Sequence, residues 1–330
     1  MIALGHSISR AGFCKAVLCA LLLTAGLVQA GEWPDRPIKL IVPYPPGGLT
    51  DTVSRVLSDE LATQLGQPIV VSNRAGAGGQ VGLQALMLEP RDGYTVALVV
   101  PATMSTLPLT NPNFPFKPLT DFEPITVAVN TYLALVVSPK LGVKSVADFV
   151  AYGKKHPGDM GYGTPGVGTS FHFNNAALAQ KLGIDVLHVP YKGEVGMLND
   201  IAGGQLQYAL VSNAGKPYID GGKVIPLAVT TAQRVASLPD VPTFKEVGVD
   251  FTSDGWVGYV AAAGTPAPIL DKLNAAFVKA IKTPRVQKLF IDMGYTPVGD
   301  SRADFRALIE ESTKSYAALL KSGAVQLDKN

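Results

Sequence analysis

The sequence predicts an α/β fold built as two lobes joined by two crossing strands, and three observations support this prediction. Strand-like and helix-like segments alternate along most of the 330 residues, which is typical of α/β proteins with a mainly parallel sheet. Two loops rich in glycine, at 43–51 and 162–170, lie between a short apolar run and a helix start. Two segments, near 126–131 and 229–231, are placed to carry the chain from one α/β series to the other and back.

The first α/β series contains alternating strands and helices: strand 38–42, a helix ending at Gly66, strand 69–71, helix 80–88 and strand 95–100. Thr50 or Asp51 is suited to cap the first helix, because both side chains accept hydrogen bonds from free backbone N–H groups. The stretch 107–124 is rich in proline and asparagine and has no helical periodicity. We therefore expect a loop there.

A second series follows, with strand 133–137, a helix after Ser145, strand 187–189, helix 195–202 and strands 206–211 and 224–230. The final third of the chain contains a predicted strand at 256–262 and covering helices at 268–281 and 302–321. Ser145 with Asp148 resembles a capping box. The predicted lobes are 31–127 with 231–330, and 128–230.

Residues 1–30 have the features of a cleaved export signal. Arg10 and Lys15 form a basic start, 16–28 is largely apolar, and Val28-Gln29-Ala30 offers a small-residue cleavage site before Gly31. The alternative is a retained N-terminal anchor, but the apolar run is short for a membrane span. We therefore expect a periplasmic protein without a lipid anchor.

The composition of the exported part excludes several chemistries. Cys14 and Cys19, the two cysteines of the chain, both lie in the signal, which leaves no disulfide, thiolate nucleophile or cysteine metal site. Removing Arg10 and Lys15 from 28 basic residues leaves 26, equal to the 26 acidic residues. With no net charge and no basic run, nucleic acid is not an expected partner.

The two glycine-containing loops predict an anion site. A helix start presents unpaired N–H groups and a partial positive charge, and small residues let a ligand approach them closely. Hydroxyl groups in the loops add further donors, from Thr50, Thr164, Thr169 and Ser170. The alternative is that both loops are only tight turns into packed helices. We expect two half-sites that close on one negatively charged molecule.

Motifs of other chemistries are missing or weak. Neither loop has the Lys-Ser/Thr pair of a phosphate-binding Walker loop, and 76–82 only superficially resembles a dinucleotide fingerprint. The sequence has no Gly-x-Ser-x-Gly and no His-Glu-x-x-His. His172 follows the second loop without an evident nucleophile partner, and no ligands cluster for a metal. The sequence therefore predicts neither an enzyme nor a cofactor.

Several stretches in order along the chain resemble the Bug receptors, the extracytoplasmic solute-binding proteins of tripartite tricarboxylate transporters. The matching stretches are Trp33-Pro34-Asp35-Arg36-Pro37 continuing to Gly48, Asn73-Arg74-Ala75-Gly76-Ala77-Gly78-Gly79, Asp92-Gly93-Tyr94-Thr95, His188-Val189-Pro190-Tyr191-Lys192-Gly193, Leu238-Pro239-Asp240-Val241-Pro242-Thr243 and Gly264-Thr265-Pro266. Each is weak alone, but together they span nearly the whole exported chain.

The resemblance implies a two-lobed, type II periplasmic-binding fold that holds one ligand carboxylate between its loops. It points to ligand-binding residues in the first loop (Tyr44, Gly47, Gly48, Leu49, Thr50), the second loop (Thr164, Val167, Gly168, Thr169, Ser170, His172) and the distal end (Ser212, Asn213). It also implies a monomer that delivers a small organic carboxylate to an integral membrane permease. A sensing subunit that reports to a membrane histidine kinase remains the alternative, and a secreted hydrolase a third.

Three residues depart from the common pattern of this family. Leu49 stands where a small residue is usual, Val167 where asparagine is frequent, and Ser212 where aspartate often pairs with a ligand ammonium. These departures favour an amino-free carboxylate with a hydrocarbon or aromatic body, namely a dicarboxylate, a tricarboxylate or an aromatic acid.

Overall fold

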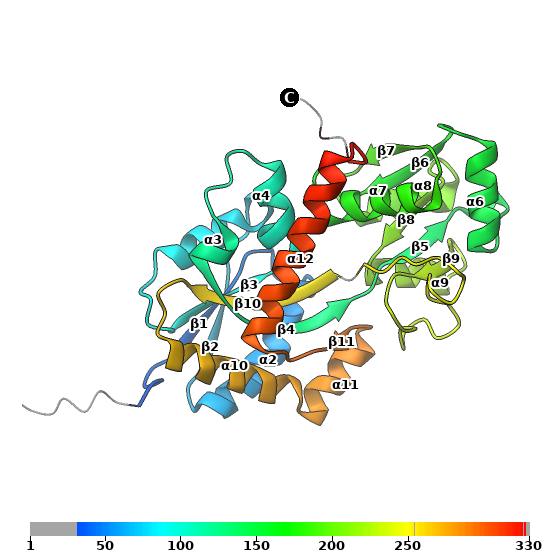
Figure 1. The fold of residues 1–330 in the computed structure, drawn as a ribbon. Coiled ribbons are helices and arrows are strands. Elements are labelled where there is room, and N and C mark those ends of the chain that lie inside the picture. Colours follow the sequence, from blue (N-terminus) through cyan, green and yellow to red (C-terminus); the bar gives the residue numbers. More distant parts are fainter. Residues whose placement is uncertain (1–31, 254, 326, 328–330) are drawn as a thin grey trace, which may run out of the picture. The chain divides into compact units, whose positions relative to one another are not determined.

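The computed structural model describes residues 32–253, 255–325 and 327. The predicted export signal, 1–30, lies outside the described residues. The chain divides into a short N-terminal unit, Met1–Asp35, and a second unit, Arg36–Asn330. The second unit contains every helix and strand described below (Figure 1).

The second unit is an α/β structure with two sheets. Its strands are β1 (Ile38–Val42), β2 (Ile69–Asn73), β3 (Thr95–Val99), β4 (Phe122–Thr131), β5 (Ala134–Val137), β6 (Met160–Thr164), β7 (Val186–Pro190), β8 (Tyr208–Val211), β9 (Ile225–Val229), β10 (Gly255–Ala262) and β11 (Thr296–Pro297). Sheet A has the order β11-β4-β10-β3-β1-β2, and sheet B the order β7-β6-β8-β5-β9.

Helices connect these strands and cover the sheets. They are α2 (Leu49–Leu65), α3 (Gln80–Met87), α4 (Leu107–Thr110), α5 (Pro118–Asp121), α6 (Val146–Lys155), α7 (Ser170–Leu182), α8 (Glu194–Gly203), α9 (Lys216–Asp220), α10 (Ala267–Ile281), α11 (Pro284–Asp292) and α12 (Arg302–Lys321). Short helical turns occur at η1 (Ala77–Gly79), η2 (Ala102–Thr106), η3 (Pro139–Leu141) and η4 (Asn213–Gly215).

The predicted α/β class is confirmed, but the expectation of mainly parallel sheets is wrong. Among the described strands, β1 pairs in parallel with β2 and β3, and β6 with β7 and β8. The strands that leave or enter a sheet where the chain passes to the other sheet, β4, β5, β9 and β10, pair antiparallel, and β11 pairs antiparallel with β4. These strands reverse direction because they leave one sheet and return to it, rather than continuing through a helical crossover.

Local differences from the sequence prediction are small. The stretch 107–124, expected as a loop, contains α4 and α5, each of four residues and each with a proline in its first turn. Proline fits that position because it lacks an N–H, and periodicity cannot be seen over one turn. Ser145 caps α6 as predicted, since its hydroxyl accepts from the Asp148 N–H at 3.0 Å, whereas the Asp148 carboxylate accepts from the Lys144 N–H at 3.3 Å.

The chain passes between the sheets at two neighbouring points. It leaves sheet A at the end of β4 and enters sheet B at β5, and it returns between β9 and β10. Thr230 and Leu133 hold the two passages together, because the Thr230 N–H donates to the Leu133 carbonyl at 2.9 Å and the Leu133 N–H donates to the Thr230 hydroxyl at 3.2 Å. The predicted lobe boundaries stay a prediction, and β4 extends past residue 127 to Thr131.

The C-terminal helix α12 makes a further connection between the two α/β series. It packs on β4 and η2 and also on α7 (Figure 1). The rings of Tyr316 on α12 and Phe173 on α7 lie 5.1 Å apart. Together with the two passages, this contact fixes the walls of the site described next.

Candidate functional site

A cavity of about 720 Å³ lies where the two α/β series meet. Elements of both sheets line it: the loop into α2, the start of α7, the loop after β8 and the beginning of β10. Nine residues expected from the sequence are on its wall: Tyr44, Gly47, Gly48, Leu49, Thr50, Thr169, Ser170, Ser212 and Asn213. Regions far apart in sequence thus line one cavity, as the prediction of two half-sites for one anion requires.

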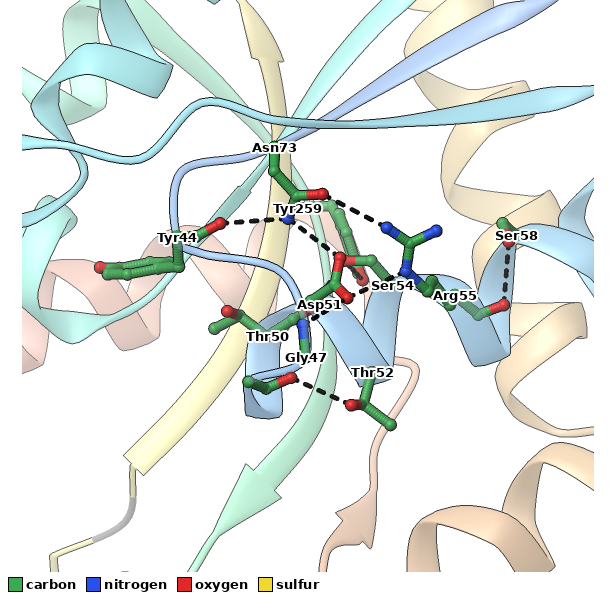
Figure 2. Close-up of polar contacts among 11 residues, drawn as sticks. Tyr44, Gly47, Thr50, Asp51, Thr52, Ser54, Arg55, Ser58, Asn73 and Tyr259 are labelled. Atoms are coloured by element: carbon green, nitrogen blue, oxygen red, sulfur yellow. Dashed lines mark hydrogen bonds and ion pairs between the residues drawn. The ribbon is translucent and has the colours of Figure 1, made fainter. Parts of the chain in front are cut away.

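The first loop is held in shape by the buried carboxylate of Asp51 (Figure 2). One oxygen accepts from the Gly47 N–H and the Arg55 Nε–H, both at 2.9 Å, and the other accepts from the Asn73 Nδ2 at 2.9 Å. Asn73 also donates to the Tyr44 carbonyl at 3.1 Å. The Arg55 hydrogen bond, with those of Gly47 and Asn73, lowers the pKa of Asp51 to about 2.

The start of α2 keeps its N–H groups available to the cavity. Its N-cap residue is Gly48, and no side chain accepts a hydrogen bond there. Among the described residues the Thr50 hydroxyl has no hydrogen-bond partner, whereas the hydroxyl of Thr52 donates to the Gly48 carbonyl at 3.0 Å. Because a helix start has unpaired donors and a partial positive charge, this end of α2 is suited to an anion.

The second loop is organised differently, because α7 has a side-chain cap. The Thr169 hydroxyl accepts from the His172 N–H at 3.3 Å and donates to the Gly166 carbonyl at 2.7 Å. Gly168 has φ +72°, and a Cβ at that position would come within 3.2 Å of Thr110. Ser170 follows on the cavity wall, and the described structure gives its hydroxyl no partner.

The other four predicted residues lie off the cavity wall. The Thr164 hydroxyl is buried and lies 2.6 Å from Nε2 of His188. His172 is also buried, and its Nδ1 accepts from the Gly168 N–H at 3.2 Å. Gly168 shapes the loop, and Val167 is 38% exposed without lining the cavity. Thr164 and His172 thus support the second loop from behind through hydrogen bonds with Gly166 and Gly168, and none of the four residues lines the cavity.

A pair of stacked histidines lies behind this loop. The ring centroids of His172 and His188 are 3.7 Å apart, and the two rings are nearly parallel, with an angle of 15° between their planes. Burial lowers the pKa of His188 to about 4. Because its Nδ1 accepts a hydrogen bond, His172 carries its hydrogen on the other ring nitrogen. With a pKa of about 4, His188 is neutral at physiological pH.

At the loop after β8, the sequence analysis missed an acidic side chain. Glu194, the first residue of α8, lines the cavity and accepts from the Ser212 N–H at 2.8 Å and the Ser212 hydroxyl at 2.7 Å. A carboxyl group thus lies beside the position where its absence had argued against an amino acid. Asn213, the next residue, donates to the Tyr295 hydroxyl at 2.7 Å.

The sequence analysis also missed the apolar part of the wall. Leu133 and Trp256 come from the segments that pass between the sheets, and Val257, Met293 and Tyr295 continue this surface. The predicted two-lobe fold could have indicated this surface, since any ligand held between two lobes must rest against the strands that join them. Leu49 lines the same cavity, as expected for a ligand with a hydrocarbon or aromatic body, whereas Val167 does not line it.

Within the described residues, no group of three or more His, Cys, Asp or Glu side chains is placed to hold a metal ion. No helix in this part of the chain is long and apolar enough to cross a membrane.

Comparison with known proteins gives a consistent result. A family model described as "Tripartite tricarboxylate transporter family receptor" matches residues 53–324. Protein BugT of Bordetella pertussis is 33% identical over 323 residues, which cover 94% of this chain and 98% of BugT. The solved structure of R. palustris Rpa4515 with adipate has a TM-score of 0.77 and 31% identity, covering 89% of this chain and 99% of that one. MatC from Rhodopseudomonas palustris with bound malate has a TM-score of 0.72 and 28% identity, covering 89% and 100%.

Proposed function

The chain belongs to the tripartite tricarboxylate transporter receptor family, and from this premise we propose that it is a periplasmic receptor that binds one small carboxylate and delivers it to a membrane permease. The site is the cavity of about 720 Å³ described above. The proposal includes export by the signal at 1–30, a monomeric state and closure of the two predicted lobes on the ligand.

One observation carries this proposal: the starts of α2 and α7 reach the same cavity. No Lys, Arg or His is among the described residues that line it, so backbone N–H groups and hydroxyls must neutralise the ligand. A charge-assisted hydrogen bond contributes about 1.5–3 kcal/mol, and each helix start adds about 0.3–1 kcal/mol. Micromolar affinity needs about 8 kcal/mol, which four or five such bonds supply after ordering costs.

The proposed ligand classes are dicarboxylates, tricarboxylates and aromatic acids. Two similar structures contain dicarboxylates, adipate in Rpa4515 and malate in MatC, which supports a carboxylate at the two loops. The apolar wall from Leu49, Leu133 and Trp256 supports a ligand with a hydrocarbon or aromatic body.

Binding is tested on protein purified from the periplasm by a thermal-shift screen against citrate, malate, adipate, terephthalate, benzoate, nicotinate and glutamate, followed by calorimetry. A ligand at 100 times its Kd stabilises the protein by about 2.7 kcal/mol, which gives a clear shift. The absence of any shift with every carboxylate would contradict the proposal.

Two variants locate the ligand in the cavity. Thr50→Ala and Ser170→Ala each remove a hydroxyl of the cavity wall, and each is expected to weaken the binding of the hit at least tenfold, because a charge-assisted hydrogen bond is lost. Ser58→Ala is the matched control, since Ser58 lies on α2 away from the cavity and its hydroxyl donates to the Arg55 carbonyl at 2.9 Å.

Transport and sensing would use the same receptor, so the genes next to the receptor gene, rather than its own sequence, distinguish the two roles. Neighbouring genes for large and small permease subunits support transport, and a gene for a membrane histidine kinase supports sensing. Turnover of a carboxylic ester or amide by the pure protein would contradict both in favour of hydrolysis.

A further inference from the structure

Glu194 occupies an unusual position for an acidic residue in this cavity. It begins α8, directly after Gly193, and lies on the wall with Ser212 and Asn213. Among the described residues of the wall, it is the only Asp or Glu, and no Lys, Arg or His accompanies it. The carboxyl group therefore has no opposite charge in the cavity.

The contacts of Glu194 define which groups it can still bind. Its two oxygens accept from the N–H and the hydroxyl of Ser212 at 2.8 and 2.7 Å. The Ser212 oxygen itself accepts from the Ala214 N–H at 3.2 Å, so its own hydrogen is directed to Glu194. A carboxylate offers about four acceptor positions, and Ser212 uses two of them. The acceptor capacity that remains lies on a cavity wall.

The cavity therefore favours different ligand groups in two places, the two helix starts and Glu194. The starts of α2 and α7 present donors and favour an anion. Burial raises the pKa of Glu194, and its two hydrogen bonds from Ser212 act in the opposite direction. In its ionised form the Glu194 carboxylate presents acceptors and a negative charge. A second ligand carboxylate at Glu194 would face a like charge without a nearby cation, which is unfavourable. A ligand N–H or O–H placed there would instead occupy an open acceptor position.

We propose that Glu194 determines the ligand class of this receptor by accepting a hydrogen bond from the far end of a bound monocarboxylate and rejecting a second carboxylate there. The inference rests on the proposed function, since it needs one ligand carboxylate at the two loops. It narrows the ligand classes proposed above, because it disfavours dicarboxylates and tricarboxylates whose second carboxylate would reach Glu194. It favours aromatic and aliphatic monocarboxylic acids with an amino, amide or hydroxyl group at the far end. The serine at 212 removes no carboxyl from the site, because Glu194 supplies one beside it.

The test uses probe pairs that differ only in the far group. They are 4-aminobenzoate and 4-hydroxybenzoate against terephthalate, 6-aminohexanoate against adipate, and 4-aminobutanoate against succinate. Calorimetry is run at pH 8, well above the ordinary pKa of glutamate, on the full chain expressed with its own signal and purified from the periplasm. In at least one pair, the wild-type protein is expected to bind the donor-bearing acid at least tenfold more tightly than the dicarboxylate.

Glu194→Gln distinguishes recognition from a structural role. It removes the negative charge and is expected to reduce the preference within the binding pair at least tenfold. A purely structural role would weaken both members equally and leave their ratio unchanged. Asp200→Asn is the control, because Asp200 lies on α8, accepts from the Tyr191 hydroxyl at 2.7 Å and does not line the cavity.

The outcomes separate the two proposals. Tighter binding of the dicarboxylates by the wild-type protein overturns the role of Glu194 and leaves the carboxylate receptor standing. An unchanged ratio in Glu194→Gln overturns it as well. If no acid of any pair binds, the proposed function falls and this inference falls with it. The wild-type ratios need no variant, so they decide the question even if Glu194→Gln does not fold.

Discussion

The two loops that face the cavity support their helix starts by different means. Behind the first loop is an ionised carboxylate, Asp51, which is paired with Arg55 and holds the Gly47 N–H. Behind the second loop are two buried, stacked rings, His172 and His188. The first support stays charged down to about pH 2, where Asp51 titrates, whereas His188 titrates near pH 4.

The difference also extends to the caps. The start of α2 has glycine at its N-cap and no side-chain acceptor, whereas the start of α7 has Thr169, which satisfies one of its N–H groups. Because Asp51 and Arg55 hold the first loop in shape, that loop needs no side-chain cap, and the first N–H groups of α2 stay unpaired. The two loops resemble each other in sequence, but they differ in what fixes them and in how many donors they offer a ligand.

The largest expected effect comes from removing the ionic support of the first loop. Asp51→Asn keeps the shape of the side chain but places an NH₂ group among the donors of Gly47, Arg55 and Asn73. Because these bonds are made by a buried carboxylate, we expect a loss of about 2–4 kcal/mol in the free energy of unfolding. Urea unfolding measures the loss, and carboxylate affinity should fall with it.

Asp59→Asn is the matched control for this variant, because Asp59 is an exposed acid on the same helix. It should change stability by less than about 0.5 kcal/mol. Equal effects of the two substitutions would show that Asp51 does not organise the loop.

The histidine pair makes the second loop sensitive to acid. Burial lowers the pKa of folded His188 to about 4, below about 6.5 in an unfolded chain. The unfolded state therefore takes up a proton first as the pH falls. The stabilisation is complete above pH 6.5 and is lost between pH 6.5 and pH 4, with a slope of at most about 1.4 kcal/mol per pH unit from this group.

His188→Gln is expected to flatten the pH dependence of stability in that range, as measured by urea unfolding at pH 4.5, 5.5, 6.5 and 7.5. His156→Gln is the control, since His156 lies at the end of α6 and does not contact the loop. A wild-type stability that stays constant from pH 7.5 to 4.5 would contradict the comparison between the loops.

A single added methyl group should affect the second loop through its backbone. Gly168 has φ +72°, where other residues are strained, and a Cβ would come within 3.2 Å of Thr110. We expect Gly168→Ala to reduce the free energy of unfolding by about 1–2 kcal/mol. Gly48→Ala is the comparison in the first loop, because Gly48 has φ −80° and its Cβ would meet nothing closer than 3.8 Å. Because glycine is preferred to alanine at an N-cap, Gly48→Ala should cost about 0.5–1 kcal/mol without backbone strain, and thermal melts of both variants measure the difference.

Much of the fold could be predicted from the sequence, because apolar runs and loop residues mark the strands and helices one by one. The directions of the strands could not be predicted, since the antiparallel pairing of β4 with β10 depends on β10 returning to the sheet that β4 leaves. The two loops could be predicted because helix starts have local signatures, but the predicted cap of the first helix, Thr50 or Asp51, was wrong: α2 begins at Leu49 with Gly48 as its N-cap. Glu194 could not, because only the fold brings α8 to the loop that carries Ser212.

The open start of α2 explains why a glycine stands where a hydroxyl residue would stabilise the helix more. Gly48→Ser supplies an N-cap acceptor for the first-turn N–H groups, and we expect it to raise the free energy of unfolding by a few tenths of a kcal/mol. The same acceptor would compete with the ligand carboxylate for those donors, so calorimetry should give a weaker Kd. Higher stability with weaker binding would indicate that this N-cap is left vacant for the ligand, as at other functional sites that give up stability. Undiminished affinity in a more stable Gly48→Ser would instead assign the anion to the capped start of α7 alone.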